Sequence, residues 1–479
     1  GWESRKAGQP FFSVFNVEHC HQSRTMTWSY DWYRRSIFHK LPAESRVADN
    51  AFEVPPFFPD TPESRKHIAR IYNSIALADR QVGEILARLE ADGLTDDTIV
   101  FCYADHGEAM LRGKANPIGL GYRVPFIVAF PDKWKHLNPW GEAGGATDEL
   151  ICFDDLGPTM LSLVGKMPAA WMTGRALLGT HRAPPRPYIY CSRNRIDDSR
   201  ACARSITDGR YLYTRHFVPG PEFRPEKYFD VADISRLMRR EHAAGTLDEV
   251  QSAMFRPQPH EVLYDLEKDR WETRNLSGQP EQAPRLANLR RRLMNHIIES
   301  RDVMIRPEYD LARISRDSTP HDEGSTSSLA ELAAILDAAD RASRPGVDPN
   351  ILKMAKSKIP VVTYWAATAL RANPGYQRDH LTLADFPYPP AAIEFAAARF
   401  IHDGDPVAAG FLREHALSGD PHLRLHALQC IQDFGKQAAT FKATLEKATK
   451  GGTYGSRCSA EMTLHFLDKR PISTPDPKW

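Results

Sequence analysis

The chain has 479 residues, 42% of them hydrophobic and 26% charged, which is the composition of a globular protein with enough apolar mass for two or three domains. No run of 18 consecutive apolar residues occurs, so the sequence predicts no membrane span. The 62 basic side chains balance the 61 acidic ones and form no basic block, so charge gives no reason to expect nucleic acid as a partner.

Three continuous apolar runs, residues 11–17, 98–103 and 124–130, predict strands of a parallel sheet that is covered on both faces. A long helix is predicted between the first two runs. Thr61 is a suitable N-cap, and the helix should end near Gly93. This alternation of strands and helix predicts an α/β sandwich, which we assign to residues 1–186.

Residues 187–310 are predicted to form a small antiparallel subdomain, because short alternating strands with turns occur at 209–215 and 261–265. Residues 282–305 carry Leu, Arg and Met at helical spacing and predict its closing helix. The polar stretch within 311–330 predicts a linker.

Residues 331–479 are predicted to be an all-α domain. Its alanine-rich segments 365–370, 395–400 and 425–430 superpose at an offset of 30 residues. Small residues at fixed places let helix pairs stack closely, which favours a short HEAT-like solenoid, with an irregular helical bundle as the alternative. Such a tail could bind a protein or a polysaccharide partner.

Polar side chains follow two of the predicted strands, at the edge where ligands of open α/β sheets bind. The second strand leads directly into Asp105, His106 and Gly107. By itself this triplet is a weak signal, because an Asp at a strand end often caps the next helix. The polar side chains at the ends of these two predicted strands and directly after them are Asn16, Glu18, His19, His21, Arg24, Asp105, His106 and Glu108.

Residues 10–305 resemble the sulfatases of the alkaline-phosphatase-like superfamily. The resemblance rests on separate segments that follow one another in the family's order: Pro10-Phe-Phe, Asn16, His21-Gln-Ser-Arg24, Asp79-Arg-Gln-Val-Gly-Glu, Ala104-Asp-His-Gly-Glu108, Lys114, Arg123-Val-Pro-Phe-Ile-Val128, Asp155-Leu-Gly-Pro-Thr159, Gly174-Arg-Ala-Leu-Leu178 and Leu263-Tyr-Asp-Leu-Glu-Lys-Asp269. Segment 183–198, followed by 208–211, is most similar to the branch that contains heparan N-sulfatase (sulfamidase).

The resemblance implies an alkaline-phosphatase-like α/β sandwich that hydrolyses a sulfuric ester or sulfamate of a sulfated polysaccharide or glycosaminoglycan-type sugar. It further implies a calcium ion and a formylglycine nucleophile, made from Cys or Ser in a Cys/Ser-x-Pro-x-Arg motif. Asp105 and His106 match the second pair of metal ligands. Because calcium prefers oxygen ligands, His106 could instead bond the sulfate.

Two further residues match catalytic positions. Lys114 matches the lysine that neutralises the sulfate oxygens, and His21 matches the histidine that faces the leaving group. A fixed cation and a proton donor both lower the barrier to attack on sulfur. The alternatives are a solvated lysine and a polar loop histidine. Three residues with a weaker prediction, either a sugar-binding surface or a structural salt-bridge cluster, are Arg193, Arg195 and Asp197.

Two family features are missing from the 479 residues: the Cys/Ser-x-Pro-x-Arg motif and the Asp-Asp pair that opens the metal site. We therefore expect an N-terminally truncated sulfatase that retains the rear part of the catalytic domain, binds calcium poorly and is inactive as it stands. The family works outside the cytosol, so an exported protein is expected, although no export signal precedes the first strand.

Two other functions remain open. Phosphodiesterases and phosphatases of the same superfamily share the Asp-His-Gly end and differ mainly in the nucleophile. A non-catalytic scaffold with a HEAT-like binding tail is the third reading.

Overall fold

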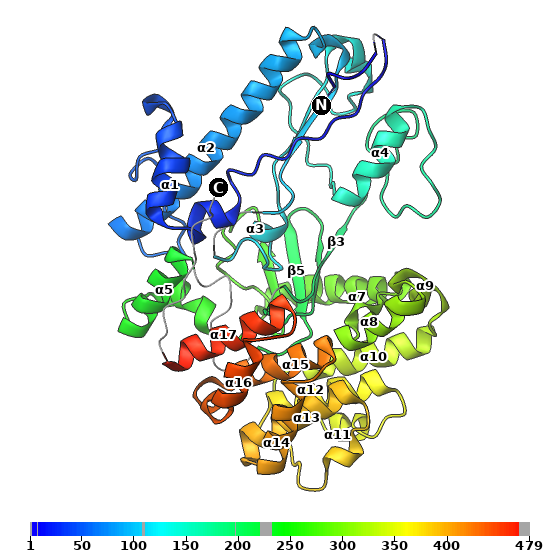
Figure 1. Cartoon of the computed structure of the whole chain (residues 1–479). Helices are drawn as coiled ribbons and strands as arrows, with labels where there is room; N and C mark the ends of the chain where they lie inside the picture. Colours follow the sequence, from blue (N-terminus) through cyan, green and yellow to red (C-terminus); the bar gives the residue numbers. More distant parts are fainter. Residues whose placement is uncertain (1, 7, 108–110, 197, 221–231, 469–479) are drawn as a thin grey trace.

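The computed structural model describes residues 2–6, 8–107, 111–196, 198–220 and 232–468. The fold contains both helices and strands. One region, with helices α1 (Tyr30–Ser36), α2 (Pro62–Ala91) and α4 (Leu156–Leu163), occupies the upper part of Figure 1, and a large group of helices forms the lower part. A four-stranded sheet, which includes β3 and β5, lies between them.

The long helix α2 (Pro62–Ala91) confirms the helix expected after Thr61. The Thr61 side chain accepts a hydrogen bond from the Ser64 backbone N–H, which satisfies one of the unpaired donors of the first turn. Gly93 follows the helix with a φ of +67°, a left-handed conformation that favours glycine. Helix α1 (Tyr30–Ser36) packs on α2 through Trp32 and Tyr33.

The prediction of a parallel sheet was wrong. Strands β1 (Val100–Tyr103) and β2 (Phe126–Ala129) pair with each other antiparallel, in register from Val100 opposite Ala129. In the described structure residues 11–17 form no strand. A continuous apolar run signals burial on both faces but carries no information about the direction of its partner. Neither strand is covered on both faces, since Tyr103 is 43% and Ile127 60% exposed.

The antiparallel strands expected after residue 187 are present. Strands β3 (Ile189–Arg193), β4 (Ala203–Thr207), β5 (Tyr211–His216) and β6 (Glu261–Asp265) form one antiparallel sheet in that order. The predicted closing helix is α7 (Ala283–Glu299), which buries Leu289, Leu293 and Ile297 in the core shared with the sheet. Helices α5 (Asp233–Ala244) and α6 (Glu249–Ser252) lie between β5 and β6 in the chain, and α5 packs against α2.

The last part of the described chain is all helical, as the alanine-rich segments predicted. Its helices are α8 (Glu308–Asp317), α9 (Pro320–Thr326), α10 (Leu329–Ala342), α11 (Asn350–Met354), α12 (Pro360–Ala372), α13 (Pro389–Asp403), α14 (Pro406–His415), α15 (Pro421–Gln432), α16 (Lys442–Ala448) and α17 (Tyr454–Asp468). Asp405 and Asp420 cap α14 and α15 by accepting backbone N–H bonds. The three similar segments lie in α12, α13 and α15.

The prediction of a linker at 311–330 was wrong, because α8, α9 and the start of α10 lie in these residues. Polar composition suggested a loop, but Thr319 caps α9 and the Arg301 guanidinium donates to the carbonyls of Gly324 and Ser327. Helices α10 to α13 share one apolar core with the sheet, where Trp365 of α12 is buried and its Nε1–H donates to the Ile305 carbonyl at 3.2 Å. Helices α14 to α17 pack with α13 in a second apolar core. None of the described helices has the length and apolar character needed to cross a membrane.

Candidate functional site

Residues from three separate segments meet where β1 ends. His21 lies in the turn that follows the extended segment 11–17, Asp105 and His106 follow β1, and Lys114 lies in the next loop. Partial burial lowers the pKa of His21, and the charges of Lys114, Arg24 and His106 lower it further, whereas Asp105 acts in the opposite direction. His21 therefore lies within electrostatic range of Asp105, His106 and Lys114, the other residues for which the sequence predicted catalytic or metal roles.

Gly107 ties this site to the rest of the fold. Its backbone N–H donates to the Gly121 carbonyl at 2.9 Å, within α3 (Gly119–Tyr122). A Cβ built on Gly107 would lie 2.0 Å from the Leu120 carbonyl oxygen, which is far inside van der Waals contact. Only glycine allows this approach, so the glycine of the Asp-His-Gly triplet is required by packing.

A second anchor of the site is Glu272, which sequence reasoning missed. This buried carboxylate accepts the backbone N–H groups of Gly119 at 2.8 Å and Leu120 at 2.9 Å. Arg112 donates to the Glu272 backbone carbonyl. Burial raises the pKa of Glu272, against the effect of the two backbone donors. No sequence pattern marks it, because its partners lie about 150 residues away in the chain.

The imidazole of His106 has a defined orientation. Its Nδ1 lies 2.8 Å from the Gly107 carbonyl oxygen, an acceptor, so Nδ1 carries the proton in the neutral ring. The other nitrogen, Nε2, is then a lone-pair donor and lies 3.6 Å from an Asp105 carboxylate oxygen. The Asp105 side chain is 87% exposed. From this position, either group could ligate a metal ion or accept a hydrogen bond from a protonated anion.

The two residues do not fit a calcium ion by themselves. Calcium takes six to eight oxygen ligands, and the pair offers one carboxylate and one imidazole nitrogen. Within the described parts of the chain, the cluster of Asp, Glu, His or Cys with metal-like spacing is Glu394, His426 and Cys430, in the helical region. Asp105 and His106 therefore provide too few oxygen ligands to hold calcium.

His21 is held by its own turn. Its Nδ1 lies 2.8 Å from the Ser23 hydroxyl, its backbone N–H donates to the Glu18 carbonyl, and Glu18 pairs with Arg24 at 2.6 Å. Because its pKa is lowered, the ring is neutral at neutral pH. It can then donate a hydrogen bond from one nitrogen and accept a proton on the other.

Cys20 is a further member of the site that sequence reasoning left without a role. Burial raises the pKa of its thiol, and the Asp105 carboxylate raises it further. The thiol is consequently protonated at neutral pH and is a poor nucleophile. Its position directly before His21, at the end of an apolar run, was the available signal.

The weaker predictions have different surroundings. Arg193, at the end of β3, donates to the Ser199 hydroxyl at 3.1 Å, and Arg195 pairs with Glu308 of α8 at 2.6 Å. The second contact is of the kind expected from a structural salt-bridge cluster, and a sugar-binding role for either arginine stays a prediction. Asp197 and Glu108 lie outside the described residues.

Residues 2–166 match the sequence model of the sulfatase family. An ulvan-active sulfatase from Formosa agariphila is 32% identical over 338 residues, which are 65% of this chain and 55% of the relative. Human N-sulphoglucosamine sulphohydrolase is 27% identical over 265 residues, 52% of this chain and 51% of the relative. The chain thus spans about half the length of these relatives.

Among solved structures, a phosphonate monoester hydrolase of Agrobacterium radiobacter matches 49% of this chain and 42% of its own, with 21% identity and a TM-score of 0.34. A structural match at this level adds nothing to the assignment. Residues 2–166 are thus similar to the sulfatase family.

Proposed function

We propose that this chain belongs to a sulfatase that acts on a sulfated polysaccharide or glycosaminoglycan-type sugar, with a sulfamidase-like N-sulfate as one candidate bond. The observation that carries the proposal is the meeting of His21, Asp105, His106 and Lys114 inside the segment that matches the sulfatase family. The names of two relatives, an ulvan-active sulfatase and N-sulphoglucosamine sulphohydrolase, support a sulfated sugar as substrate.

In this proposal Lys114 compensates the negative charge on the sulfate oxygens. His21 donates a hydrogen bond from its ring N–H to the leaving atom, which stabilises the charge that builds there as the bond to sulfur breaks. Asp105 and His106 would be part of a metal site that needs further oxygen ligands. A bound divalent metal and a formylglycine would supply charge compensation and the nucleophile.

The 479 residues contain no Cys/Ser-x-Pro-x-Arg sequence from which a formylglycine could form. We therefore propose that this polypeptide by itself binds a sulfated ligand weakly and hydrolyses none. Measurable turnover by the purified chain, abolished by Asp105→Ala, would contradict this part of the proposal.

The remaining parts of the proposal concern the whole protein. An exported location follows from the family. The helical region would be a HEAT-like module that binds a protein or a polysaccharide, and the missing motif also supports a second candidate, a non-catalytic scaffold built on a sulfatase framework.

Ligand binding tests the sulfatase proposal without requiring turnover. Glucosamine N-sulfate and ulvan oligosaccharides are titrated against the chain and followed by NMR, with the desulfated sugars and a sugar phosphate as competitors. We expect shifts of the His21 ring signals with the sulfated ligands only. Lys114→Ala should remove this response and raise the pKa of His21, whereas Lys166→Ala, at an exposed position, should change neither. Equal binding of desulfated sugar, or preference for the phosphate, would contradict the proposal.

A further inference from the structure

Helix α7, which packs on the four-stranded sheet (Figure 1), has two faces of different chemistry. One face is apolar and buried in the core that the helix shares with the sheet. The opposite face carries three exposed guanidinium groups, two amides and an imidazole, from Arg285, Asn288, Arg291, Arg292, Asn295 and His296. The carboxylate of this helix, that of Glu299, belongs to its last residue. The outer face of α7 is therefore positive over most of its length.

The charges of this outer face are not neutralised by neighbouring carboxylates. Arg290, on the flank of the helix, pairs with Glu261 at 2.5 Å. Among the described residues no such ion pair exists for Arg285, Arg291 or Arg292. The ion pair that gives Arg290 a structural role is thus missing for the three exposed arginines.

Two of the exposed guanidinium groups are nevertheless held in place, by tyrosine rings. The Arg285 Cζ lies 3.6 Å from the centroid of the Tyr211 ring, and the Arg292 Cζ lies 4.7 Å from that of Tyr188. A cation over an aromatic ring is attracted to it and keeps its full charge. Stacking also restricts the long side chains before any ligand binds, so less conformational entropy is lost on binding. Both charges are therefore preorganised for an anion.

The spacing of these groups suits a linear polyanion that also carries hydroxyl groups. Arg285 and Arg292 are seven residues apart, which is two helical turns or about 10.5 Å along the axis. Guanidinium groups bind oxyanions through parallel N–H donors, and the amides of Asn288 and Asn295 can bond to hydroxyl groups. A sulfated polysaccharide offers both kinds of partner along one chain.

Other polyanions match the molecule less well. Nucleic-acid-binding domains are strongly basic as a whole, whereas this chain has 62 basic and 61 acidic side chains. A helix that lies on a membrane needs an exposed apolar face beside its basic one, but the apolar face of α7 is buried in the core. Charge and hydrogen-bonding chemistry thus favour the sulfated sugar polymer.

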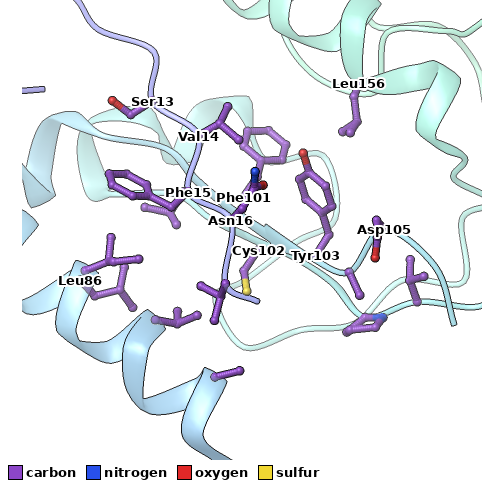
Figure 2. Close-up of a pocket in the computed structure, with 18 of the residues that line it drawn as sticks. Ser13, Val14, Phe15, Asn16, Leu86, Phe101, Cys102, Tyr103, Asp105 and Leu156 are labelled. Atoms are coloured by element: carbon purple, nitrogen blue, oxygen red, sulfur yellow. The ribbon is translucent and has the colours of Figure 1, made fainter. Parts of the chain in front are cut away.

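This face is separate from the candidate site, because the two lie on opposite faces of the sheet. Tyr213 of β5 lies in the core shared with α7, and the hydroxyl of the next residue, Thr214, donates to the Pro117 carbonyl at 2.9 Å. Successive residues of a strand point to opposite faces. Pro117 lies in the loop that carries Lys114 of the candidate site. Figure 2 shows another part of that site, Asp105, at the end of β1 beside a groove of about 2960 Å³.

We propose that the outer face of α7 is a second binding surface, which holds a sulfated polysaccharide chain at a distance from the candidate site. The choice of ligand rests on the proposed function, whereas the surface itself rests on the unpaired and stacked arginines of α7. The surface retains the polymer near the protein and takes no part in the hydrolysis of a bond.

Polymer binding tests this surface. Ulvan and heparan sulfate, each with its chemically desulfated form, are titrated against the chain by calorimetry at low and at high salt. We expect the sulfated polymers to bind, and to bind more weakly at high salt, because salt screens exposed charges. The double variant Arg285→Gln, Arg292→Gln should weaken binding about tenfold, since it removes two exposed ionic contacts.

Two further variants keep the result specific. Arg291→Glu reverses an exposed charge whose hydrogen bond is to Asn288 of the same helix, so it should weaken binding without unfolding the chain. The matched control, Lys436→Gln with Lys450→Gln, removes two exposed charges from the helical region and should bind like the unmodified chain. Chemical denaturation checks that all variants are folded.

No binding of either sulfated polymer, equal binding of the desulfated forms, or equal binding by the double variant and Arg291→Glu would overturn the proposal. Tighter binding of polyglutamate or of single-stranded DNA through the same arginines would assign the face to an acidic polypeptide or to a nucleic acid instead. The proposed function fails separately. If the His21 signals ignore glucosamine N-sulfate while α7 binds the polymers, the surface stands and the sulfatase assignment does not. The double variant should leave the His21 response unchanged.

Discussion

Strands β1 and β5 differ in how far the rest of the molecule covers them. β1 is apolar throughout, and β5 also carries Thr214, Arg215 and His216, yet every residue of β5 is buried, whereas β1 has three half-buried residues and an exposed one. Helix α7 and the core shared with α10, α12 and α13 cover the β5 sheet. Within the described residues only part of such a cover lies over β1. Whether a strand is buried thus depends on the layer that covers it and not on its apolar composition alone.

Charged groups differ between the two parts in the same way. In the helical region Glu394 is fully buried and meets Arg200 at 2.5 Å, Arg371 at 2.7 Å and His426 at 2.5 Å. Burial alone would raise the pKa of Glu394, but the two guanidinium groups hold it well below its usual range. A metal dication at Glu394, His426 and Cys430 would face both guanidinium groups, so this cluster is a structural ion network. Asp105, by contrast, has an exposed carboxylate.

Glu394→Ala should have the largest effect, because it leaves two buried guanidinium groups without their carboxylate. We expect a loss of about 3–5 kcal/mol in the free energy of unfolding of the helical region. Urea titration with pulsed hydrogen exchange measures this region by region. Glu414→Ala, at an exposed position on α14, is the control and should change stability by less than about 0.5 kcal/mol. A loss below about 1 kcal/mol for Glu394→Ala would refute the role of the network.

A matched pair of strand isoleucines tests the difference in cover directly. Ile206 on β4 is fully buried, and Ile127 on β2 is 60% exposed. Ile206→Ala should cost about 2–5 kcal/mol through the cavity that it leaves. Ile127→Ala should cost less than about 1 kcal/mol, because little apolar surface is removed from a buried environment. Chemical denaturation measures the loss of unfolding free energy in each variant. Similar losses at both positions would contradict the difference in cover between the two parts.

Acid should weaken the antiparallel sheet through Glu261. Burial alone would raise its pKa, but hydrogen bonds from His260 and Arg290 and from the Tyr213 hydroxyl lower it to about 2, from 4.5. A lowered carboxyl pKa contributes stability above pH 4.5 that is lost as the pH falls towards 2. The contribution is on the order of 3 kcal/mol.

Unfolding free energies of the unmodified chain and Glu261→Gln, measured from pH 7 to pH 2.5, check this expectation. The difference between the two should shrink as the pH falls below 4.5. Glu267→Gln, at a 63% exposed side chain, should follow the unmodified chain. A constant difference over the whole range would contradict the assignment to Glu261.

Gly107→Ala should have the smallest effect on global stability and a local one on the site. The added Cβ meets the Leu120 carbonyl oxygen, so α3 or the Asp-His-Gly turn must move, at a cost of about 1–3 kcal/mol. The His106 ring signals should shift in NMR spectra. Gly83→Ala in α2 has open space around its Cβ and should stabilise the helix by about 0.5–1 kcal/mol. An unchanged site in Gly107→Ala would show that the close approach does not hold this turn.

The local elements were predictable from particular residues. Thr61 and Pro62 marked the start of α2, alternation within 209–215 and 261–265 marked β5 and β6, and the alanine-rich segments marked α12, α13 and α15. These signals act over a few residues, through capping bonds and side-chain periodicity. The helices within 311–330 were missed because their polar faces resemble a loop in composition.

The sequence predicted some residues of the site and missed others. Resemblance to the sulfatases selected His21, Asp105, His106 and Lys114, and the structure brings these four together. Cys20 and Glu272 were missed, because each acts only through neighbours that the fold supplies. The functional roles of all these residues remain proposals to be tested as described above.

The sequence by itself determined the helices, the strand-forming runs, the similarity of residues 2–166 to the sulfatases and the absence of a Cys/Ser-x-Pro-x-Arg motif. Only the tertiary structure decided the antiparallel pairing of β1 with β2, the anchoring of Gly107 against α3, and the exposed groove beside Asp105. The physical reason is range: capping and periodicity depend on neighbours in the chain, whereas pairing direction and burial depend on which distant layer covers a given face.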